Sequence, residues 1–463
     1  MAFQPHPNLL SATVVTPPSP VASGTSMTVS TAWATKVAAL SLPVMAVVSP
    51  DFTEPDDSNS EIVQITAANG GTGLLTIVRA RESTSARNIA AGDRVRIGLT
   101  AKSLTDIEGV LAWTNERLAK TADYTVANAD RGKTLALGGS AYFTLTLNAA
   151  SGYDANFAIR VVNEDTGRAK RISPNGVTSF LLYPGQDCMV YAQNNAWKTT
   201  NPGRWRLTGS VTVYVDGTNG NANNDGLASG SGNALATLQQ AANMVRDSVD
   251  LNGQAVTISV ADGTYTAGVS MTSGWTGAGT VTFTGNTGTP SSCVISVTSG
   301  NCFQFTNNVL ATIGGGFKLQ TTTSGSAVRS ETGAVVTISG AMEYGACATN
   351  HLHSINGGRI IVAANYTISG GCSVHAAGAG PASLVNIAGL TITLTGTPAW
   401  GVAFAQGFNL GNVIASSTCT FSGSATGARY TATLNGVVRV DGAASTYFPG
   451  NSAGSTASGG QYA

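Results

Sequence analysis

A short alternating pattern of apolar and hydroxyl residues recurs through the second half of the chain. Each copy reads apolar, Thr, apolar, Ser or Thr, Gly, so the apolar side chains point to one face of a strand and the hydroxyls to the other. The copies close at Gly285, Gly340, Gly370, Gly396 and Gly423, with a degraded copy closing at Gly315. Their spacing, 25 to 30 residues, predicts a solenoid in which each coil is one rung. An irregular β-sandwich with evenly spaced strands is the alternative.

The repeat predicts a rod with a hydrocarbon interior and a hydroxyl-lined exterior. Roughly seven rungs fit between Ala255 and Val440, and at about 4.8 Å per rung they make a rod on the order of 30 Å long. We expect the closing glycines to adopt the positive φ of a corner. Residues 234–249 carry apolar side chains at helical spacing after Asn233, a good N-cap, and predict an amphipathic helix that covers the first rung.

The first half of the chain predicts smaller domains. Residues 62–100 alternate in short segments separated by Gly-rich turns and predict a small β-domain, and residues 121–209 predict a second one. Between them, residues 103–120 hold the only long helical pattern of this half. Its heptad positions are Leu104, Ile107, Leu111 and Leu118. This spacing is typical of a short parallel trimeric coiled coil, and a single helix packed on its own domain is the alternative.

Charge separates the two halves and excludes several partners. The 463 residues carry 24 basic and 24 acidic side chains, of which residues 210–463 hold only 6 and 8. A net charge of zero offers no electrostatic footprint, so we expect no nucleic acid as a partner. No apolar stretch is long enough for membrane insertion, and the N-terminus lacks the basic and apolar regions of a signal peptide. The six cysteines have no C-x-x-C spacing and fit no disulfide framework or zinc site.

Residues 211–265 carry a more specific order of elements. The order is the strand Val211-Thr-Val-Tyr-Val, then Asp216-Gly, a loop ending Asn224-Asp-Gly, a helix with Leu238-Gln-Gln-Ala, and the strand Val256-Thr-Ile-Ser-Val before Asp262-Gly-Thr-Tyr. This order resembles the start of a pectate-lyase-like right-handed β-helix. Such starts occur in phage tailspikes and tail fibres and in polysaccharide-degrading enzymes. Beyond residue 265 the resemblance rests on the period alone.

The first half carries two further resemblances. The segment from Thr76-Ile-Val-Arg-Ala-Arg to Val95 resembles the N-terminal modules by which many phage fibres attach to the tail or baseplate. It departs from the usual Arg-Gly by carrying Ala80 in place of the glycine. Residues 124–205 resemble in layout a spacer module of phage fibres, which Trp197 or Trp205 would close against its core. These resemblances imply that residues 1–120 bind a phage tail or baseplate protein.

Together the pattern and the resemblances predict an all-β fold. Small N-terminal β-domains precede a right-handed parallel β-helix with an N-terminal capping helix, and the chain assembles as a homotrimer. The expected parts are a virion-docking β-domain over 1–102, a helical linker over 103–120, a β spacer over 121–209, the β-helix over 210–440 and a C-terminal tip over 441–463. In a trimer the tip would be wound with the two sister chains.

Catalytic and metal-binding candidates are few. Glycan hydrolysis needs two carboxylates about 5 to 9.5 Å apart, and the candidates after the cap are Glu331 and Glu343. Their separation is under half a coil and favours different faces, while a pair drawn from two chains of a trimer is the alternative. His351 and His353 would share one face of a strand, so three copies around a threefold axis would form a metal site. Ordinary surface polarity is the alternative for this pair, and we expect no cofactor.

Binding requires less machinery than catalysis. Carbohydrate recognition uses aromatic faces among neutral polar groups. The candidate glycan contacts are Trp275, Tyr344, Tyr366, Trp400 and Phe408. For each of them a place in the core is the alternative. Asp216 and Asp225 lack the spacing of an EF-hand calcium loop, so we expect them to form hydrogen-bonded turns.

The expected function is mechanical and adhesive. The resemblances imply a phage tail fibre or tailspike that attaches to the virion by its N-terminus and contacts a host surface polysaccharide or receptor with its β-helix. Such a protein would assemble in the host cytoplasm and reside in the virion. A polysaccharide depolymerase on the same scaffold is the first alternative, and a purely structural collar or head fibre is the second.

Overall fold

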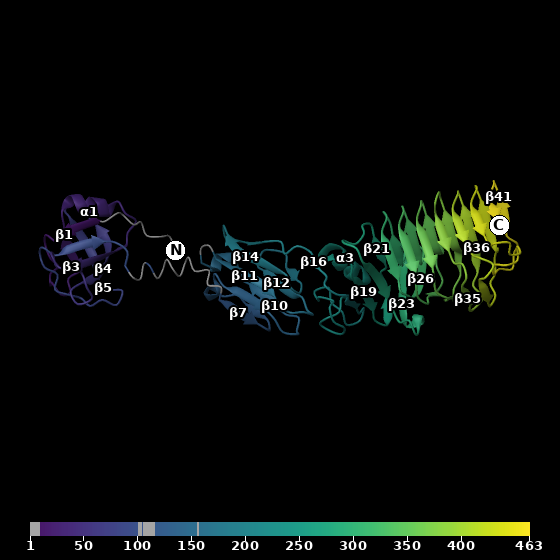
Figure 1. Cartoon of the computed structure of the whole chain (residues 1–463), viewed down its shortest axis with the longest axis horizontal. Helices are drawn as coiled ribbons and strands as arrows, with labels where there is room; N and C mark the ends of the chain where they lie inside the picture. The colour runs from purple at the N-terminus through teal and green to yellow at the C-terminus, as the bar shows by residue number, and fades with distance from the viewer. Residues whose placement is uncertain (1–9, 101–103, 105–115, 155–156) are drawn as a thin grey trace. The chain divides into compact units, whose positions relative to one another are not determined.

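The computed structural model describes residues 10–100, 104, 116–154 and 157–463. Over these residues the chain is built mainly of β-strands, with α1 and α3 as the principal helices. The chain divides into two compact units, the first made mainly of the residues before 117 and the second mainly of the residues from 117 to 463 (Figure 1). The prediction of an all-β fold that contains a solenoid is confirmed.

The first unit is an antiparallel sheet with one helix. Its elements are β1 (Leu10–Thr13), β2 (Ser26–Thr28), α1 (Thr31–Ala38), β3 (Val44–Ser49), β4 (Glu61–Ala68), β5 (Leu74–Arg81) and β6 (Arg94–Ile97). The strands lie in the order β1-β6-β3-β4-β5-β2. Strand β4 alternates, and its buried Val63 and Ile65 share a core with Trp33 and Val37 of α1. The sequence pattern missed α1 because a helix of two turns carries too few apolar positions to show a period.

A buried ion pair fixes the chain after β5. Glu61 is fully buried, and its carboxylate accepts hydrogen bonds from Arg79 Nε (2.8 Å) and Nη2 (2.7 Å). Burial would raise the pKa of Glu61, but Arg79 and the backbone N–H groups of Ala80 and Arg87 hold it below its ordinary value. Ala80 adopts a φ of 50°, in the left-handed region that favours glycine. The alanine that departs from the usual Arg-Gly therefore occupies a strained position.

Residues 117–199 form the second β-domain. Its strands are β7 (Arg117–Lys120), β8 (Tyr124–Thr125), β9 (Thr134–Leu137), β10 (Thr144–Leu147), β11 (Ala158–Asn163), β12 (Lys170–Pro174), β13 (Phe180–Leu182), β14 (Asp187–Gln193) and β15 (Ala196–Thr199). They make two sheets, ordered β13-β12-β10-β8 and β15-β14-β11-β9-β7. Trp197 is buried and its indole N–H donates to the carbonyl oxygen of Asn148 (2.7 Å), so Trp197 closes this core.

The helical linker predicted over 103–120 is wrong at Leu118, which lies in a strand. Residues 117–120 form β7, which pairs in register with β9 and so needs an extended backbone at Leu118. Leu104 is described and its side chain is 49% exposed. Ile107 and Leu111 lie outside the described residues. Leu118 fits the heptad spacing by chance. A strand of only four residues with one half-buried leucine leaves this spacing intact in the sequence.

Backbone pairing and a buried ion pair join the spacer to the solenoid. Strand β16 (Trp205–Arg206) pairs in parallel with β18 (Val249–Asp250). Asp225 is fully buried and accepts hydrogen bonds from Arg168 Nε (2.8 Å) and Nη2 (2.9 Å). The backbone N–H of Ala169 donates to the same carboxylate. Since a buried charge without its partner is costly, this ion pair holds the joint in one geometry.

The capping helix α3 (Leu238–Ser248) is confirmed, but it starts later than predicted. Thr237 is the N-cap in place of Asn233. The hydroxyl of Thr237 accepts from the N–H of Gln240, and the Gln240 side chain accepts from the N–H of Thr237. This reciprocal capping box satisfies two backbone donors at once. The buried face of α3 is formed by Leu238, Ala241, Ala242 and Val245.

Residues 211–462 form a parallel β-solenoid of three sheets, which we call sheets I, II and III. Sheet I holds β17 (Val211–Val215), β19 (Ala255–Val260), β22 (Thr280–Thr284), β25 (Leu310–Ile313), β28 (Val335–Ile338), β31 (Arg359–Val362), β34 (Leu384–Asn386), β37 (Asn412–Ile414), β40 (Val437–Arg439) and β42 (Gln461–Tyr462). Sheet II holds β20 (Gly263–Tyr265), β23 (Cys293–Ser299), β26 (Lys318–Ser324), β29 (Glu343–Tyr344), β32 (Tyr366–Ile368), β35 (Thr391–Leu394) and β38 (Thr420–Ser422). Sheet III holds β21 (Val269–Met271), β24 (Phe303–Phe305), β27 (Val328–Glu331), β30 (Asn350–Ile355), β33 (Cys372–Ala379), β36 (Trp400–Phe408), β39 (Tyr430–Thr433) and β41 (Ser455–Ala457). Seven successive coils, from β19–β21 to β37–β39, give one strand to each sheet within this fully described range.

The copies of the sequence repeat all lie in strands, but the earlier and the later copies lie in different sheets. The copies that close at Gly285, Gly315 and Gly340 belong to sheet I, whereas those that close at Gly370, Gly396 and Gly423 belong to sheet II. Strands of both sheets have inward apolar and outward hydroxyl side chains. The motif therefore predicts a strand but does not predict the sheet to which the strand belongs. The true coil is given by register partners in sheet I, where Val336, Ile360, Val385, Val413 and Val438 lie one above another.

The closing glycines are required for two different reasons. Gly315, Gly396 and Gly423 have positive φ, as expected of corners. Gly340 does not, and a Cβ built there would collide with the carbonyl oxygen of Gly314 in the coil below. For Gly285, Gly340 and Gly370 the expectation of a positive φ is wrong, because the close approach of neighbouring coils selects these glycines.

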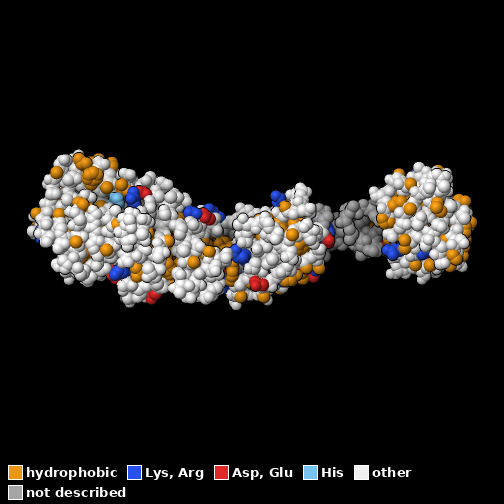
Figure 2. Space-filling view, turned by 180° about the vertical axis from the view of Figure 1, so that it is seen from behind, with side chains coloured by type: hydrophobic (Ala, Val, Ile, Leu, Met, Phe, Trp, Pro, Cys, Tyr) orange, Lys and Arg blue, Asp and Glu red, His pale blue; other side chains and the backbone are white. Residues whose placement is uncertain are grey.

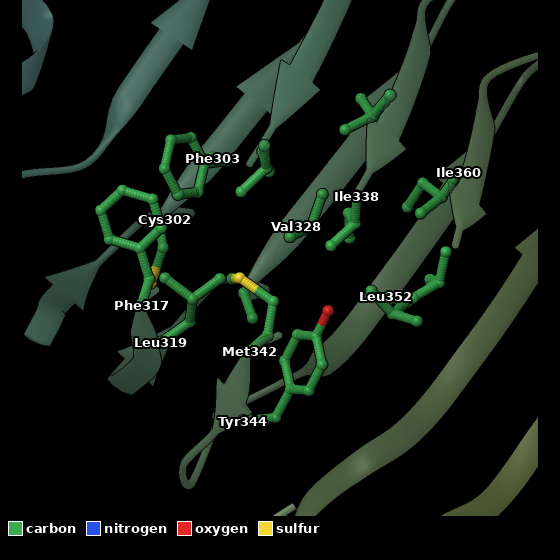
Figure 3. Close-up of a cluster of buried hydrophobic side chains, with 14 of the residues drawn as sticks. Cys302, Phe303, Phe317, Leu319, Val328, Ile338, Met342, Tyr344, Leu352 and Ile360 are labelled. Carbon is green, nitrogen blue, oxygen red and sulfur yellow. The ribbon is translucent and has the colours of Figure 1, made fainter. Parts of the chain in front are cut away.

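The interior is a continuous stack of apolar side chains from successive coils. Figure 3 shows part of it, with side chains from sheets I, II and III converging between the strands. Its labelled residues are Cys302, Phe303, Phe317, Leu319, Val328, Ile338, Met342, Tyr344, Leu352 and Ile360. All six cysteines of the chain are buried free thiols.

The last residues close the solenoid and form no separate tip. Strands β41 and β42 continue sheets III and I in register, so the predicted boundary at 440 is wrong. Phe448 is 1% exposed and packs against Phe404 at 5.1 Å between ring centroids. The hydroxyl of Tyr447 donates to the carbonyl oxygens of Ser416 and Cys419. Tyr447 and Phe448 therefore pack against the preceding coils of the solenoid.

Candidate functional site

The predicted catalytic glutamates lie on different sheets. Glu331 ends β27 of sheet III, where it accepts hydrogen bonds from Gln304 (2.7 Å) and Arg329 (2.8 Å). Glu343 starts β29 of sheet II and pairs with Lys318 (2.7 Å). The expectation that they face different ways is confirmed, so within one chain they form no carboxylate pair of the kind that glycan hydrolysis uses.

The environment of each glutamate favours the ionised form. Burial would raise the pKa of Glu331, but Arg329 and Gln304 hold it below its ordinary value. Burial would likewise raise the pKa of Glu343, and Lys318 with the hydroxyl of Ser369 lowers it. A general acid for glycoside cleavage needs a raised pKa, which neither environment supplies.

The two predicted metal ligands do not share a face. His351 is fully buried, and its Nε2 lies 2.8 Å from the carbonyl oxygen of Gly345 while its Nδ1 lies 2.9 Å from Nδ1 of His375. Both ring nitrogens of His351 are therefore occupied. His353 lies half-buried on the outer side of sheet III, where burial and the neighbouring Arg329 lower its pKa to about 4. The prediction of a joint metal site is wrong, because alternation breaks where the chain turns into β30.

Three of the predicted glycan contacts belong to the core. Tyr344, Tyr366 and Trp400 are each less than 5% exposed, so they present no face to a ligand. Tyr344 and Tyr366 instead pack edge to face at 5.2 Å. Phe408 is 39% exposed on sheet III. Only Phe408 and the half-buried Trp275 are left as surface aromatics among the five candidates.

Trp275 forms one wall of a groove beside sheet I. The groove has a volume of about 480 Å³, and the indole N–H of Trp275 donates to the carbonyl oxygen of Leu310 (2.8 Å). The side chain of Leu310 is 66% exposed. Sequence reasoning missed Leu310, although its outward position in the alternating segment Leu310-Ala-Thr-Ile provided a signal.

Hydroxyls in register continue the groove along sheet I. Thr257, Thr282, Thr312 and Thr337 are successive register partners on the outer face of β19, β22, β25 and β28. Thr312 and Thr337 line the groove together with the backbone of residues 277–280. Charged side chains are few and isolated over the solenoid face seen in Figure 2. An aromatic wall, an apolar edge and neutral hydroxyls are the groups that recognise a sugar ring.

The acidic loop before the cap is held by hydrogen bonds. The carboxylate of Asp216 accepts from the backbone N–H groups of Thr218 and Asn219, both at 2.9 Å. These contacts lower the pKa of Asp216, with the N–H of Asn219 as the main cause. Asp225 forms an ion pair with Arg168. Within the described residues, no group of three or more His, Cys, Asp or Glu side chains is placed to hold a metal ion.

Comparison with models of known protein families gives no match, and comparison with curated proteins gives none either. In the part of the chain that the structure describes, helices are too short or too polar to cross a lipid bilayer. We therefore infer function from the surface of the solenoid and from the residues that line its grooves.

Proposed function

We propose that this chain is the adhesive subunit of a phage tail fibre or tailspike, which attaches to the virion by its N-terminal unit and binds a neutral host surface polysaccharide with its solenoid. The observation that carries the proposal is the groove beside Trp275. It combines an aromatic face, the exposed Leu310 and a row of threonine hydroxyls on a surface with few charges. The resemblance of residues 76–95 to fibre docking modules supports virion attachment.

The proposal includes assembly as a homotrimer. In the later coils the outer face of sheet I carries half-buried apolar side chains, which lone chains leave in contact with water. They are Ile361, Leu384, Ile414 and Val437. Register places them in two columns, in which Asn386 and Asn412 lie between the apolar side chains. Covering these side chains with a sister chain removes apolar area from water, which stabilises by about 25 cal/mol per Å². Sedimentation equilibrium of the full-length chain tests this part, with three chain masses as the expected result and one chain mass as the contrary one.

Adhesion without cleavage is favoured over depolymerisation. Glu331 and Glu343 lie on different sheets, and both have lowered pKa values. An enzyme would need a proton donor near neutral pH. We therefore expect the chain to bind polysaccharide and leave it intact.

The experiment exposes the full-length chain to an array of neutral bacterial polysaccharides and measures both binding and reducing ends. The proposal expects binding that Trp275→Ala weakens by about tenfold, because stacking on an aromatic face contributes about 1 kcal/mol or more. Phe52→Ala is the matched control, an exposed aromatic of the first unit, and should bind as the parent does. Release of oligosaccharide would favour the depolymerase instead. Antibody labelling of phage particles that carry the gene tests virion attachment, and unlabelled particles would contradict it.

A further inference from the structure

A second groove lies at the joint between the spacer and the solenoid. It has a volume of about 820 Å³, within the range of ligand sites. The spacer lines it with residues 179–181 and 199–203, and the solenoid lines it with residues 222–225 and one side of α3. None of the predicted catalytic, glycan-contact or His metal-ligand candidates lies in it.

The walls of this groove are held by several independent contacts. The buried pair of Arg168 and Asp225 and the pairing of β16 with β18 fix the two lobes to each other. The hydroxyl of Tyr142 also donates to the carbonyl oxygen of Asn223 across the joint (2.5 Å). A groove held in this way exists before a ligand arrives, which lowers the entropy cost of binding.

The charged side chains Arg171 and Asp247 at the groove already have hydrogen-bond partners. Arg171 donates to the hydroxyls of Tyr142 (2.7 Å) and Ser179 (2.8 Å) and to the carbonyl oxygen of Asn223. Asp247 is paired with Arg246 through two hydrogen bonds of 2.7 Å. Each nitrogen of the Arg171 guanidinium therefore already has an acceptor, and the Asp247 carboxylate already has a cationic partner.

Amide groups remain free within the groove. Among the described residues no protein partner is formed by the side chain of Asn223 or by the NH₂ groups of Asn243 and Gln240. An amide both donates and accepts, so it matches vicinal hydroxyls. The half-buried Phe180 and Met244 add apolar surface for the C–H face of a sugar ring.

We propose that the joint groove is a second binding site for a neutral saccharide. This proposal rests on the adhesive function proposed above. Asn223, Asn243 and Gln240 hydrogen-bond the sugar hydroxyls, and Phe180 packs against the ring. A long polysaccharide that occupies this groove and the groove beside Trp275 on one chain, or on neighbouring chains, gains avidity by effective concentration.

The test uses the full-length chain and short oligosaccharide fragments of whichever neutral polysaccharide the array identifies, with calorimetry as the readout. We expect two sites per chain. Asn223→Ala combined with Asn243→Ala should remove one site or weaken it at least tenfold, since each lost hydrogen bond contributes about 1 kcal/mol. Ala222→Trp, which fills the groove without removing a hydrogen bond, should do the same. Gln406→Ala, an amide substitution on sheet III, is the matched control and should leave both sites.

Unchanged stoichiometry and affinity in both groove variants would overturn the inference. If Trp275→Ala then abolishes all binding, the adhesive function stands and only the second site fails. If no neutral polysaccharide on the array binds the chain, the second site fails as well. In that case, binding of the labelled full-length chain to host cells decides separately whether the adhesive function survives.

Discussion

Lowering the pH from 6.5 to 5 should destabilise the solenoid through two buried histidines. The carbonyl oxygen of Gly345 can only accept, so His351 donates from Nε2 and its Nδ1 is free of a proton. His375 then donates from Nδ1 to His351, and its Nε2 accepts from the hydroxyl of Tyr366 (2.8 Å). Both rings are therefore neutral. A proton added to Nδ1 of His351 would point at the N–H of His375.

The magnitude follows from linkage. Burial lowers the pKa of His351 to about 4 and the pKa of His375 well below 6.5, and the positive charge of one ring would disfavour charging of the other. The unfolded chain takes up a proton on each ring near pH 6.5, while the native chain does not. Stability is therefore full above pH 6.5 and falls as the pH drops, by about 1.4 kcal/mol per pH unit for each ring. For these two rings the loss between pH 8 and 5 is about 4 kcal/mol. His353, whose pKa is also lowered to about 4, adds to the loss in the same direction.

Urea unfolding at pH 8, 6.5 and 5 measures this loss, with tryptophan fluorescence as the signal because Trp400 lies 6.1 Å from the ring of His375. His375→Phe should be less stable than the parent at pH 8. Its free energy of unfolding should also depend less on pH, with a slope that is smaller by about 1.4 kcal/mol per pH unit. Tyr366→Phe removes a hydroxyl without removing a titrating ring, so it should keep the parent slope. An equal slope in the parent and His375→Phe would refute the assignment of neutral, proton-resisting rings.

Three substitutions test other parts of the fold. Ala80→Gly should stabilise the first unit by about 1 kcal/mol, raising its melting temperature, because glycine relieves the left-handed backbone; a lower melting temperature would contradict this. Asp225→Asn should destabilise the joint by about 3–5 kcal/mol in urea unfolding, since Arg168 is left buried without a counter-charge. Equal stability of this variant and the parent would count against a rigid joint. Gly340→Ala should lower the solenoid's melting temperature by forcing neighbouring coils apart, and an unchanged temperature would show that the coils can yield.

The local pattern predicted strands better than it predicted their places. Alternation identified β22 and β32 by the same motif, yet they belong to sheets I and II. The motif depends on which side of a strand is buried, and both sheets bury one side in the same way. The place of a strand in the coil depends on the lengths of the corners between strands, which change along the chain.

The site residues show the same limit. Because residues two apart on a strand share a face, His351 and His353 were expected on the same side. His351 and Leu352 are both fully buried, so the alternation does not hold across them. Aromatic side chains among threonines were equally ambiguous. Tyr366 and Trp275 are each followed by a threonine, and only the path of the chain puts Tyr366 in the core and Trp275 beside a groove. The joint groove was beyond sequence reasoning because its two walls meet only through tertiary contacts.

The two grooves have a common origin in the interruption of a regular surface. Successive coils place hydroxyls at the spacing of the strands, so the outer faces of the sheets repeat and offer similar groups at each level. Such a surface has little means of choosing among ligands. The loop that carries Trp275 and the joint before α3 are two places where the repeat is broken and a concave surface with distinct groups results. If the chain binds saccharide as proposed, these breaks determine which saccharide is chosen, and the regular coils hold them at a fixed separation.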